Sequence, residues 1–273
     1  MILFIYVYKK NNMINKIVHF SDLHIRLYKD HDLFREILSE AFAQWVGLKP
    51  DRIVFTGDLV HSKNQMTPEL VEFIVWVLEE CAKISKTIVI IGNHDFLETN
   101  MDRLDAITPI VDSIKNPKIS YLKERGVYAD ENVNWCVYSL MQHNIPPDIP
   151  KKSEGTVNIG LFHGAIKGLK TDVGHTIEDG FDSNIFAGCD IVLCGDIHKR
   201  AIFDIPGNKS AVMIGSFLQN NFGENITNHG YGIYEIDKDD YQFVDLHNPT
   251  PYLSFKITSY DDIKNDNEIL TNK

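Results

Sequence analysis

The chain has 273 residues, of which 44% are hydrophobic and 24% charged, so it can bury one sizeable core plus a small appendage. Its 27 basic and 38 acidic residues give a net charge of -11, which excludes a strongly basic surface and predicts weak binding to polyanions by this chain alone. No apolar segment approaches the roughly 20 residues that a membrane-spanning helix needs, so we expect no membrane partner.

Five short apolar segments, rich in β-branched residues, predict buried strands along the chain. They span residues 17–20, 53–55, 88–91, 159–162 and 191–194. A polar block follows each of them, at residues 21–24, 57–61, 92–95, 163–164 and 195–198. Ligands of open α/β sheets bind beyond the carboxyl ends of the strands, so the five blocks are expected to converge on one place.

The segments between the blocks predict crossover helices. Residues 32–46 carry apolar side chains at intervals of three and four, which is an amphipathic pattern. Thr67 and Pro68 suit the N-cap and first position of a second helix. A third helix is expected over 101–114, with Pro109 as its kink or its start.

The second half of the chain predicts further strands. Residues 133–140 and 211–214 are expected to be strands, and 232–236 pairs with 241–246 as a hairpin over a polar turn. Four cysteines without paired spacing are typical of reduced core residues. The basic pair at 199–200 follows the last polar block and can meet a phosphate, although such pairs are usually ordinary surface.

The residue types in the polar blocks suit a metal site. Asp22 and His24 are two apart, so continued strand geometry would put both side chains on one face, where they can share an ion. Carboxylate, imidazole and amide groups together favour manganese, iron or zinc over calcium. Two such ions about 3.5–4 Å apart can clamp the attacking and leaving oxygens of a displacement at phosphorus. Asp58 is the natural bridging ligand.

These blocks resemble those of the calcineurin-like metallophosphoesterases, and within them the SbcD-type nuclease subunits of recombination and repair complexes. The start of the resemblance is residues 13–24, and it continues to about Tyr252. It implies an α/β fold, a four-layer αββα sandwich of two mixed β-sheets flanked by helices. It also implies two divalent metal ions, most often Mn²⁺, with Mg²⁺, Fe²⁺ or Zn²⁺ as alternatives.

The resemblance assigns roles to individual residues of the polar blocks. His94 would stabilise or protonate the leaving oxygen, and Asp95 or His61 would orient His94. One metal would be held by Asp22, His24, Asp58 and His198, and the other by Asp58, Asn93, His163 and Asp196. The family more often has a histidine where this chain has Asp196, whose added negative charge leaves the metal preference open.

Finer features favour the nuclease branch of the family. Protein phosphatases of the superfamily usually carry Asp-Arg-Gly after the second block and a Glu after Asn-His, whereas this chain has His61-Ser-Lys and Asp95 there. Residues 215–217, 222–224 and 230–231 also resemble the segment that follows the last metal block in SbcD-type proteins.

The resemblance implies a double-strand DNA exonuclease and single-strand endonuclease, as in phage recombination endonucleases. It would act on DNA together with an SbcC-type ATPase subunit, and pairing of two copies of the chain as a homodimer stays open. The expected compartment is the cytoplasm or, for a viral protein, the host cytoplasm. Two alternatives stay open: a metallophosphoesterase for small-molecule phosphoesters or phosphoproteins, and a metal-free protein-binding scaffold.

The same resemblance divides the chain into three parts. Residues 1–12 are expected to be an N-terminal extension, 13–252 the nuclease domain, and 253–273 the start of a missing or truncated capping region with a polar tail.

Overall fold

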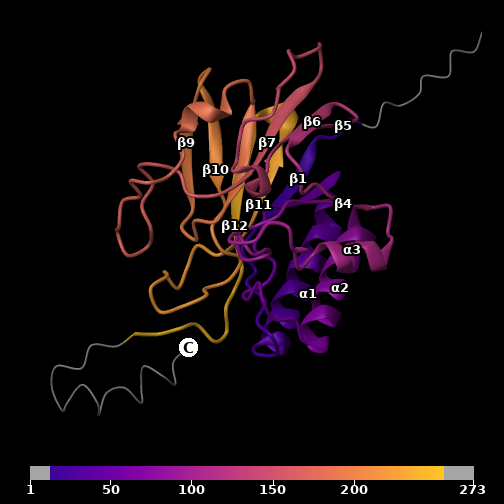
Figure 1. Ribbon diagram of the computed structural model, residues 1–273, viewed down its shortest axis with the longest axis vertical. Coiled ribbons are helices and arrows are strands. Elements are labelled where there is room, and N and C mark those ends of the chain that lie inside the picture. The colour runs from indigo at the N-terminus through magenta and orange to yellow at the C-terminus, as the bar shows by residue number, and fades with distance from the viewer. Residues whose placement is uncertain (1–12, 255–273) are drawn as a thin grey trace, which may run out of the picture.

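The first of two six-stranded sheets is built from both halves of the sequence (Figure 1). The computed structural model describes residues 13–254. This sheet runs in the order β12 (Asp240–Asp245), β11 (Gly230–Glu235), β1 (Lys16–Phe20), β2 (Arg52–Phe55), β3 (Lys86–Val89) and β4 (Ile119–Tyr121). Strands β1 to β4 are parallel, whereas β11 pairs antiparallel with both β1 and β12. The expected hairpin over residues 237–240 is therefore confirmed.

The second sheet has the same mixed character. Its order is β5 (Gly126–Asp130), β6 (Val133–Tyr138), β7 (Val157–His163), β8 (Ile191–Gly195), β10 (Lys209–Met213) and β9 (Ala201–Ile205). The four central strands are parallel, and antiparallel strands close both edges. The two mixed sheets confirm the α/β fold expected from the sequence.

Apolar side chains of both sheets meet between them. Ile17, Val54 and Ile88 of the first sheet share a buried cluster with Ile159 and Leu193 of the second. Side chains alternate along a strand, so the neighbouring residues of the first sheet point the other way, toward the helices. The sheets are thereby stacked face to face, which brings the ends of β1, β2, β3, β7 and β8 near one another.

Three helices cover the outer face of the first sheet (Figure 1). They are α1 (His31–Leu48), α2 (Pro68–Ile84) and α3 (Thr108–Ile114). In α1 the apolar positions at intervals of three and four are buried, including Ile37, Ala41 and Trp45. The Thr67 hydroxyl accepts a hydrogen bond from the Leu70 amide, so the expected N-cap of α2 is confirmed.

The outer face of the second sheet is covered differently. There a buried cluster joins strand residues such as Tyr138, Phe162 and Met213 to Phe186 of the short 3-10 helix η2 (Ser183–Phe186) and to Ile166 of a loop. Two more 3-10 turns, η1 (Leu140–Gln142) and η3 (Ile236–Lys238), lie at strand ends. All four cysteines are buried and free, as expected for core residues.

The structure corrects some expected boundaries. The third helix begins at Thr108, not at residue 101, and Pro109 lies in its first turn, where a proline needs no amide hydrogen bond. Residues 101–107 form turns instead. Strand β6 ends at Tyr138, two residues before the expected end. The sequence analysis did not identify β4, β5 and β9, and the extension and the tail lie outside the described residues except for residues 253 and 254.

Candidate metal centre

The five polar blocks meet where β1, β2, β3, β7 and β8 end. The loops after β1 and β2 run side by side, since the amide of Asp22 donates to the carbonyl of Gly57 and that of His24 to the carbonyl of Asp58, both at 3.0 Å. An isolated parallel bridge between Ile25 and Val60 continues this pairing beyond the two loops. The backbone therefore fixes the two ligand-bearing loops relative to each other.

Asp22 and His24 come together for a reason that differs from the expected one. Strand β1 ends at Phe20, and both residues have a left-handed backbone, with φ of 52° and 46°. The idea of continued strand geometry is therefore wrong. Their side chains still converge, because His24 Nε2 lies 3.8 Å from Asp22 Oδ1. Asp58 is left-handed too, at φ 60°, so the site stores backbone strain.

The first group of donor atoms surrounds His24 Nε2. That nitrogen lies 3.4 Å from Asp58 Oδ2 and 3.0 Å from His198 Nε2. His198 Nε2 in turn is 3.7 Å from Asp22 Oδ1. Asp22, His24 and His198 together have the spacing of a metal site. With Asp58, these are the four side chains that the resemblance assigns to one ion.

The second group surrounds His163 Nε2. It lies 3.3 Å from Asp58 Oδ1, 3.2 Å from Asn93 Oδ1 and 3.8 Å from Asp196 Oδ1. Asp22 also comes within metal-binding distance of Asp58 and His163, so two carboxylates lie between the groups. Side chains from both sheets thus form a possible site for two metal ions.

Hydrogen bonds leave the relevant imidazole nitrogens free for a cation. His163 Nδ1 lies 2.6 Å from the Thr56 carbonyl oxygen, which can only accept, so Nδ1 carries the hydrogen. His198 Nδ1 is likewise 2.8 Å from Glu224 Oε1. His163 Nε2 then faces carboxylate and amide oxygens, and His198 Nε2 faces Asp22 Oδ1 and the Nε2 of His24, so lone pairs meet lone pairs. A cation between such atoms satisfies them all, so the donor set fits divalent metals.

Burial of the carboxylates also favours a site for divalent metal ions. Burial raises the pKa of Asp22 to about 6, because an ionised group is costly to keep away from water. Burial alone would lower the pKa of His163, but the carboxylates of Asp58, Asp22 and Asp196 raise it well above its usual value. Positive charge is therefore favoured here, and bound cations would supply it.

Two glycines allow the loops to approach this closely. A Cβ atom on Gly92 would lie 2.1 Å from the Asp58 amide nitrogen and 2.2 Å from its Oδ1. A Cβ atom on Gly195 would lie 2.1 Å from Ser21 Oγ. Any side chain at either position would push apart the blocks that carry the donor atoms.

His94 and His61 lie beside the first donor group. The His94 amide donates to Asp58 Oδ1 at 2.8 Å, and His94 Nδ1 lies 2.8 Å from the carbonyl oxygen of His61. The rings of His24 and His94 are 4.6 Å apart, and those of His61 and His94 are 5.9 Å apart. His61 therefore orients His94 through its main chain, and the Nε2 atom of His94 is left to meet a substrate.

Asp95 has a different position from the one expected. Its side chain is buried, and its two oxygens accept bonds from the amides of Asp58, Leu59, Val60 and Gly92, at 2.9 to 3.1 Å. These contacts hold the loop that carries Asp58 rather than the ring of His94. In the part of the chain that the structure describes, Asp95 therefore positions the loop that carries Asp58 and makes no hydrogen bond to the ring of His94.

The sequence analysis missed the role of Glu224. Besides His198 Nδ1, its carboxylate accepts from the Ser216 hydroxyl at 3.1 Å and from the Asn220 amide at 2.8 Å. It thereby fixes the ring orientation of a metal-ligand candidate. In the sequence, its role was indicated only by the resemblance of residues 222–224 to the segment after the last metal block in SbcD-type proteins. A glutamate in a polar loop forms no recognisable motif by itself.

Comparisons with known proteins give a family match, a viral relative and a similar solved structure. The sequence model of the family described as "Calcineurin-like phosphoesterase" matches residues 15–269. The uncharacterized protein R555 of Acanthamoeba polyphaga mimivirus is 30% identical over 257 residues, or 89% of this chain and 19% of that protein, so the chain spans about a fifth of its length. The crystal structure of TT1561 of Thermus thermophilus matches with a TM-score of 0.54 and 11% identity, over 86% of this chain and 99% of that one. The latter likeness concerns the fold alone.

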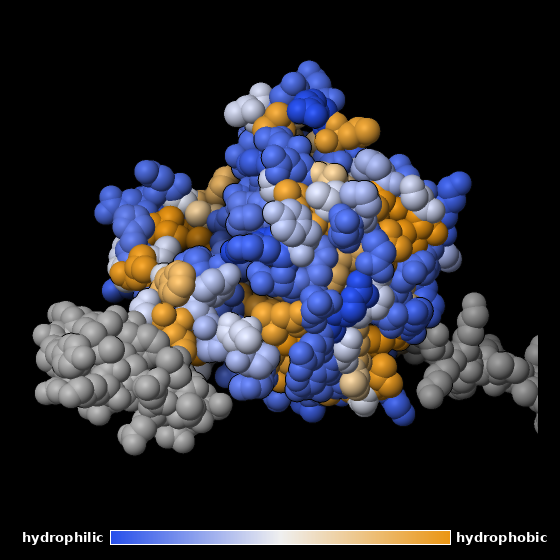
Figure 2. All heavy atoms as spheres, turned by 90° about the horizontal axis from the view of Figure 1, so that it is seen from below, coloured by the Kyte–Doolittle hydropathy of each residue, from blue (hydrophilic) through white to orange (hydrophobic). Residues whose placement is uncertain are grey.

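The described helices give no sign of a membrane span. None of them is long and apolar enough to cross a bilayer. In the view of Figure 2 the surface is mostly hydrophilic, and apolar residues appear in separate groups.

Proposed function

The chain belongs to the calcineurin-like phosphoesterase family, and from this premise we propose that it is a two-metal-dependent nuclease that hydrolyses phosphodiester bonds of DNA. The observation that carries the proposal is the convergence of donor atoms from both sheets beside a histidine whose Nε2 is uncommitted. The donor atoms belong to Asp22, His24, Asp58, Asn93, His163, Asp196 and His198.

The metal ions would be held in two neighbouring positions. His24, His198 and Asp22 would hold one, and His163, Asn93 and Asp196 the other, with Asp58 between them. Bound Mn²⁺, our first choice, would activate water and neutralise charge on the phosphate. The mixture of carboxylate, imidazole and amide donors also admits Mg²⁺, Fe²⁺ or Zn²⁺.

His94 supplies the proton that the leaving oxygen needs. Its Nδ1–H donates to the carbonyl oxygen of His61, so a second proton can only sit on Nε2. The attacking water would lose a proton to solvent, and as its oxygen forms the new P–O bond and the old P–O bond breaks, the Nε2–H of His94 protonates the departing alkoxide. His61 and Asp58 hold the ring and the backbone of His94 in place for this transfer.

The preference for DNA over a phosphomonoester or phosphoprotein rests on the residues around His94. His61 and Asp95 stand where protein phosphatases of the superfamily have other residues, and this pattern resembles SbcD-type nucleases. The net charge of -11 favours the alternative of a small-molecule phosphodiesterase, because it opposes binding of a polyanion. We propose that an SbcC-type ATPase partner, or a second copy of the chain, supplies further DNA-binding surface.

The test is cleavage of end-labelled linear duplex and single-stranded DNA with Mn²⁺ or Mg²⁺. The His94→Ala variant should cut about 10²- to 10⁴-fold more slowly, since general acid catalysis contributes that much. Its metal content, measured by mass spectrometry, should match that of the wild type. His175→Ala, which removes an exposed histidine that is not among the donor groups, is the matched control.

Three results would contradict the proposal. Unchanged cutting by His94→Ala would remove the acid role from this residue. Hydrolysis of a chromogenic phosphodiester without any cutting of DNA would favour the small-molecule phosphoesterase. A purified chain that binds no divalent metal would favour the protein-binding scaffold, which the convergence of acceptor atoms opposes.

A further inference from the structure

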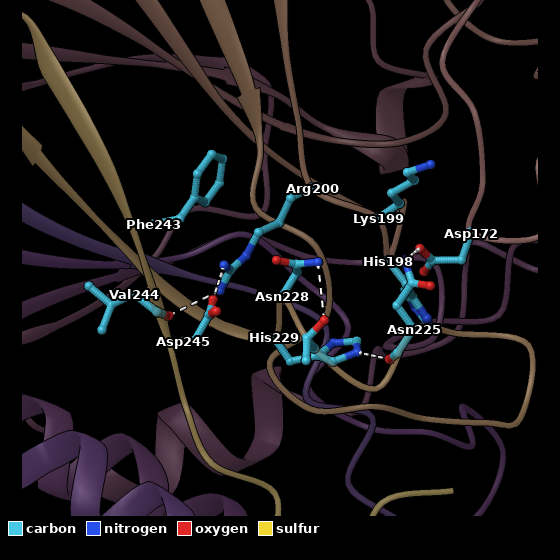
Figure 3. Close-up of a pocket in the computed structure, with 11 residues that line it drawn as sticks. Asp172, His198, Lys199, Arg200, Asn225, Asn228, His229, Phe243, Val244 and Asp245 are labelled. Atoms are coloured by element: carbon cyan, nitrogen blue, oxygen red, sulfur yellow. Dashed lines mark hydrogen bonds and ion pairs between the residues drawn. The ribbon is translucent and has the colours of Figure 1, made fainter. Parts of the chain in front are cut away.

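A cavity of about 660 Å³ opens beside the metal centre, and we call it the side cavity (Figure 3). It lies between the turn after β8, the segment before β11 and the end of β12. His198 forms part of its wall, and the same side chain belongs to the first donor group. A smaller cavity of about 260 Å³ shares His198 and Lys199 with it and also reaches Asp196. The side cavity therefore borders the first donor group through His198.

The floor of the side cavity is fixed by contacts among its own residues. The Arg200 guanidinium donates to the Val244 carbonyl at 3.0 Å, pairs with Asp245 and lies 5.0 Å from the centre of the Phe243 ring. Asn225 donates to Asp172 at 2.7 Å. These charges are matched within the protein, so the floor is a preformed polar surface and not an anion site.

Two side chains at the cavity remain available to a ligand. In Figure 3 the Lys199 ammonium points away from Asp172, and no residue drawn there forms an ion pair with it. The Asn228 amide group donates weakly to Thr227 Oγ1, at 3.4 Å, and its carbonyl oxygen accepts no bond from the residues drawn. The lining thus offers one cation, Lys199, which borders both cavities, and neutral hydrogen-bonding groups on the exposed Asn225 and Asn228.

This arrangement matches the chemistry of a nucleotide. The volume lies within the roughly 300–1,000 Å³ of small-molecule sites, so it is far larger than a phosphate group needs. A lysine suits the backbone phosphate as a point charge, and asparagine can both donate to and accept from sugar hydroxyls or base edges. A bare phosphate would leave the asparagines unused.

We propose that the side cavity binds the nucleotide next to the phosphodiester that is cleaved, with Lys199 on the neighbouring phosphate and Asn228 on the sugar or base. This inference rests on the proposed function, and it specifies how that site selects nucleotide esters over other phosphodiesters.

The experiment compares two chromogenic substrates that share the same leaving group. Thymidine 3′-phosphate 5′-(p-nitrophenyl phosphate), called the thymidine ester below, carries a nucleoside and a neighbouring phosphate, whereas bis(p-nitrophenyl) phosphate carries neither. The wild type should have the lower KM for the thymidine ester. Lys199→Ala and Asn228→Gly should each raise that KM about tenfold, as expected for loss of a hydrogen bond to a charged or buried group. The kcat for both esters and the KM for bis(p-nitrophenyl) phosphate should stay unchanged.

Two matched control variants separate a loss of nucleotide binding from a general loss of structure or activity. Asn208 also has a left-handed backbone, at φ 54° against 71° for Asn228, so Asn208→Gly reproduces the backbone change away from the cavity. Lys118→Ala removes an exposed lysine at another place. Both controls should keep the wild-type KM for each ester.

The outcomes distinguish the inference from the proposed function. If the wild type cuts DNA but the two cavity variants leave the KM of the thymidine ester unchanged, the side cavity is not a nucleotide site. An equal KM of the wild type for both esters would also overturn the inference. If the wild type hydrolyses both esters but no DNA, the nuclease function itself fails, and with it the assignment of the cavity to a DNA nucleotide.

Discussion

The two sheets contribute to the metal centre in different ways. The first sheet supplies Asp22 and Asp58, whose side chains are only 0% and 2% exposed. The second supplies Asp196 and His198, which are 20% and 25% exposed. The buried carboxylates of the first sheet therefore set where the ions lie, whereas Asp196 and His198 of the second sheet are open to solvent. The difference concerns these four ligands and not the whole sheets, because His163 of the second sheet is buried and His94 of the first is partly exposed. Substitutions in each sheet can separate these two contributions.

Asp58 is the residue on which both donor groups depend. Replacing it by asparagine should abolish activity and reduce the affinity of both ions by at least about 100-fold, because even outer-shell changes at metal sites cost about 10- to 100-fold. His198→Ala should weaken only one ion. Calorimetric titration with Mn²⁺ measures both, and selective loss of one ion in Asp58→Asn would refute the bridging role.

A substitution of Asp95 tests how rigidly the first sheet holds the loop that carries Asp58. In Asp95→Asn one oxygen becomes an NH₂ group that faces backbone donors, so two amides lose their acceptor. We expect the free energy of unfolding to fall by about 2–4 kcal/mol, since each unsatisfied buried donor costs about 1–3 kcal/mol. Urea unfolding at equilibrium gives the value, and a loss below about 0.5 kcal/mol, less than a single net hydrogen bond contributes, would show that the loop is held by other contacts.

Glu224 provides the corresponding test in the second half. Glu224→Gln keeps the size of the side chain but weakens its bond to His198 Nδ1. One ion should bind about tenfold more weakly, while the stability of the metal-free protein changes little. Equally weaker binding of both ions would show that Glu224 does not act through His198 alone.

His19 gives the first sheet a pH dependence of its own. It is fully buried between Thr56 and Tyr241, and burial lowers its pKa from 6.5 to about 3. The unfolded chain therefore binds a proton below pH 6.5 that the folded chain does not, and this contribution to stability is lost as the pH falls from 6.5 toward 3. The expected loss from about pH 6 to about pH 5 is about 1 kcal/mol. Urea unfolding of wild type and His19→Gln isolates it, because the variant should lack this slope; parallel slopes would contradict the assignment.

The sequence predicted the five strands that precede the polar blocks, and the meeting of those blocks, for a clear physical reason. Buried parallel strands such as residues 191–194 are continuous apolar runs, and the polar residues that follow them stand out. The sequence could not reveal that Asp22 and His24 are left-handed, because this conformation is imposed by pairing with the loop after β2.

Other structural features were not predicted, because they depend on residues far away in the sequence. Strands β4 and β5 are short and only partly buried, so they lack the apolar run that marks a strand. Residues 101–107 were expected to be helical but form turns, and the Ala106 amide donates to the carbonyl of Asp95 in the metal-centre block. Glu224 acts through an interaction across 26 residues, for which no local pattern exists.

The pairing of β1 with β11 has a consequence for how the molecule is made. Lys16 faces Glu235 across the first sheet, so a nascent chain cannot complete this sheet until residues 230–235 have left the ribosome. His163, Asp196 and His198 are also translated long after Asp22 and Asp58. The complete set of donor atoms therefore comes together only late in biosynthesis.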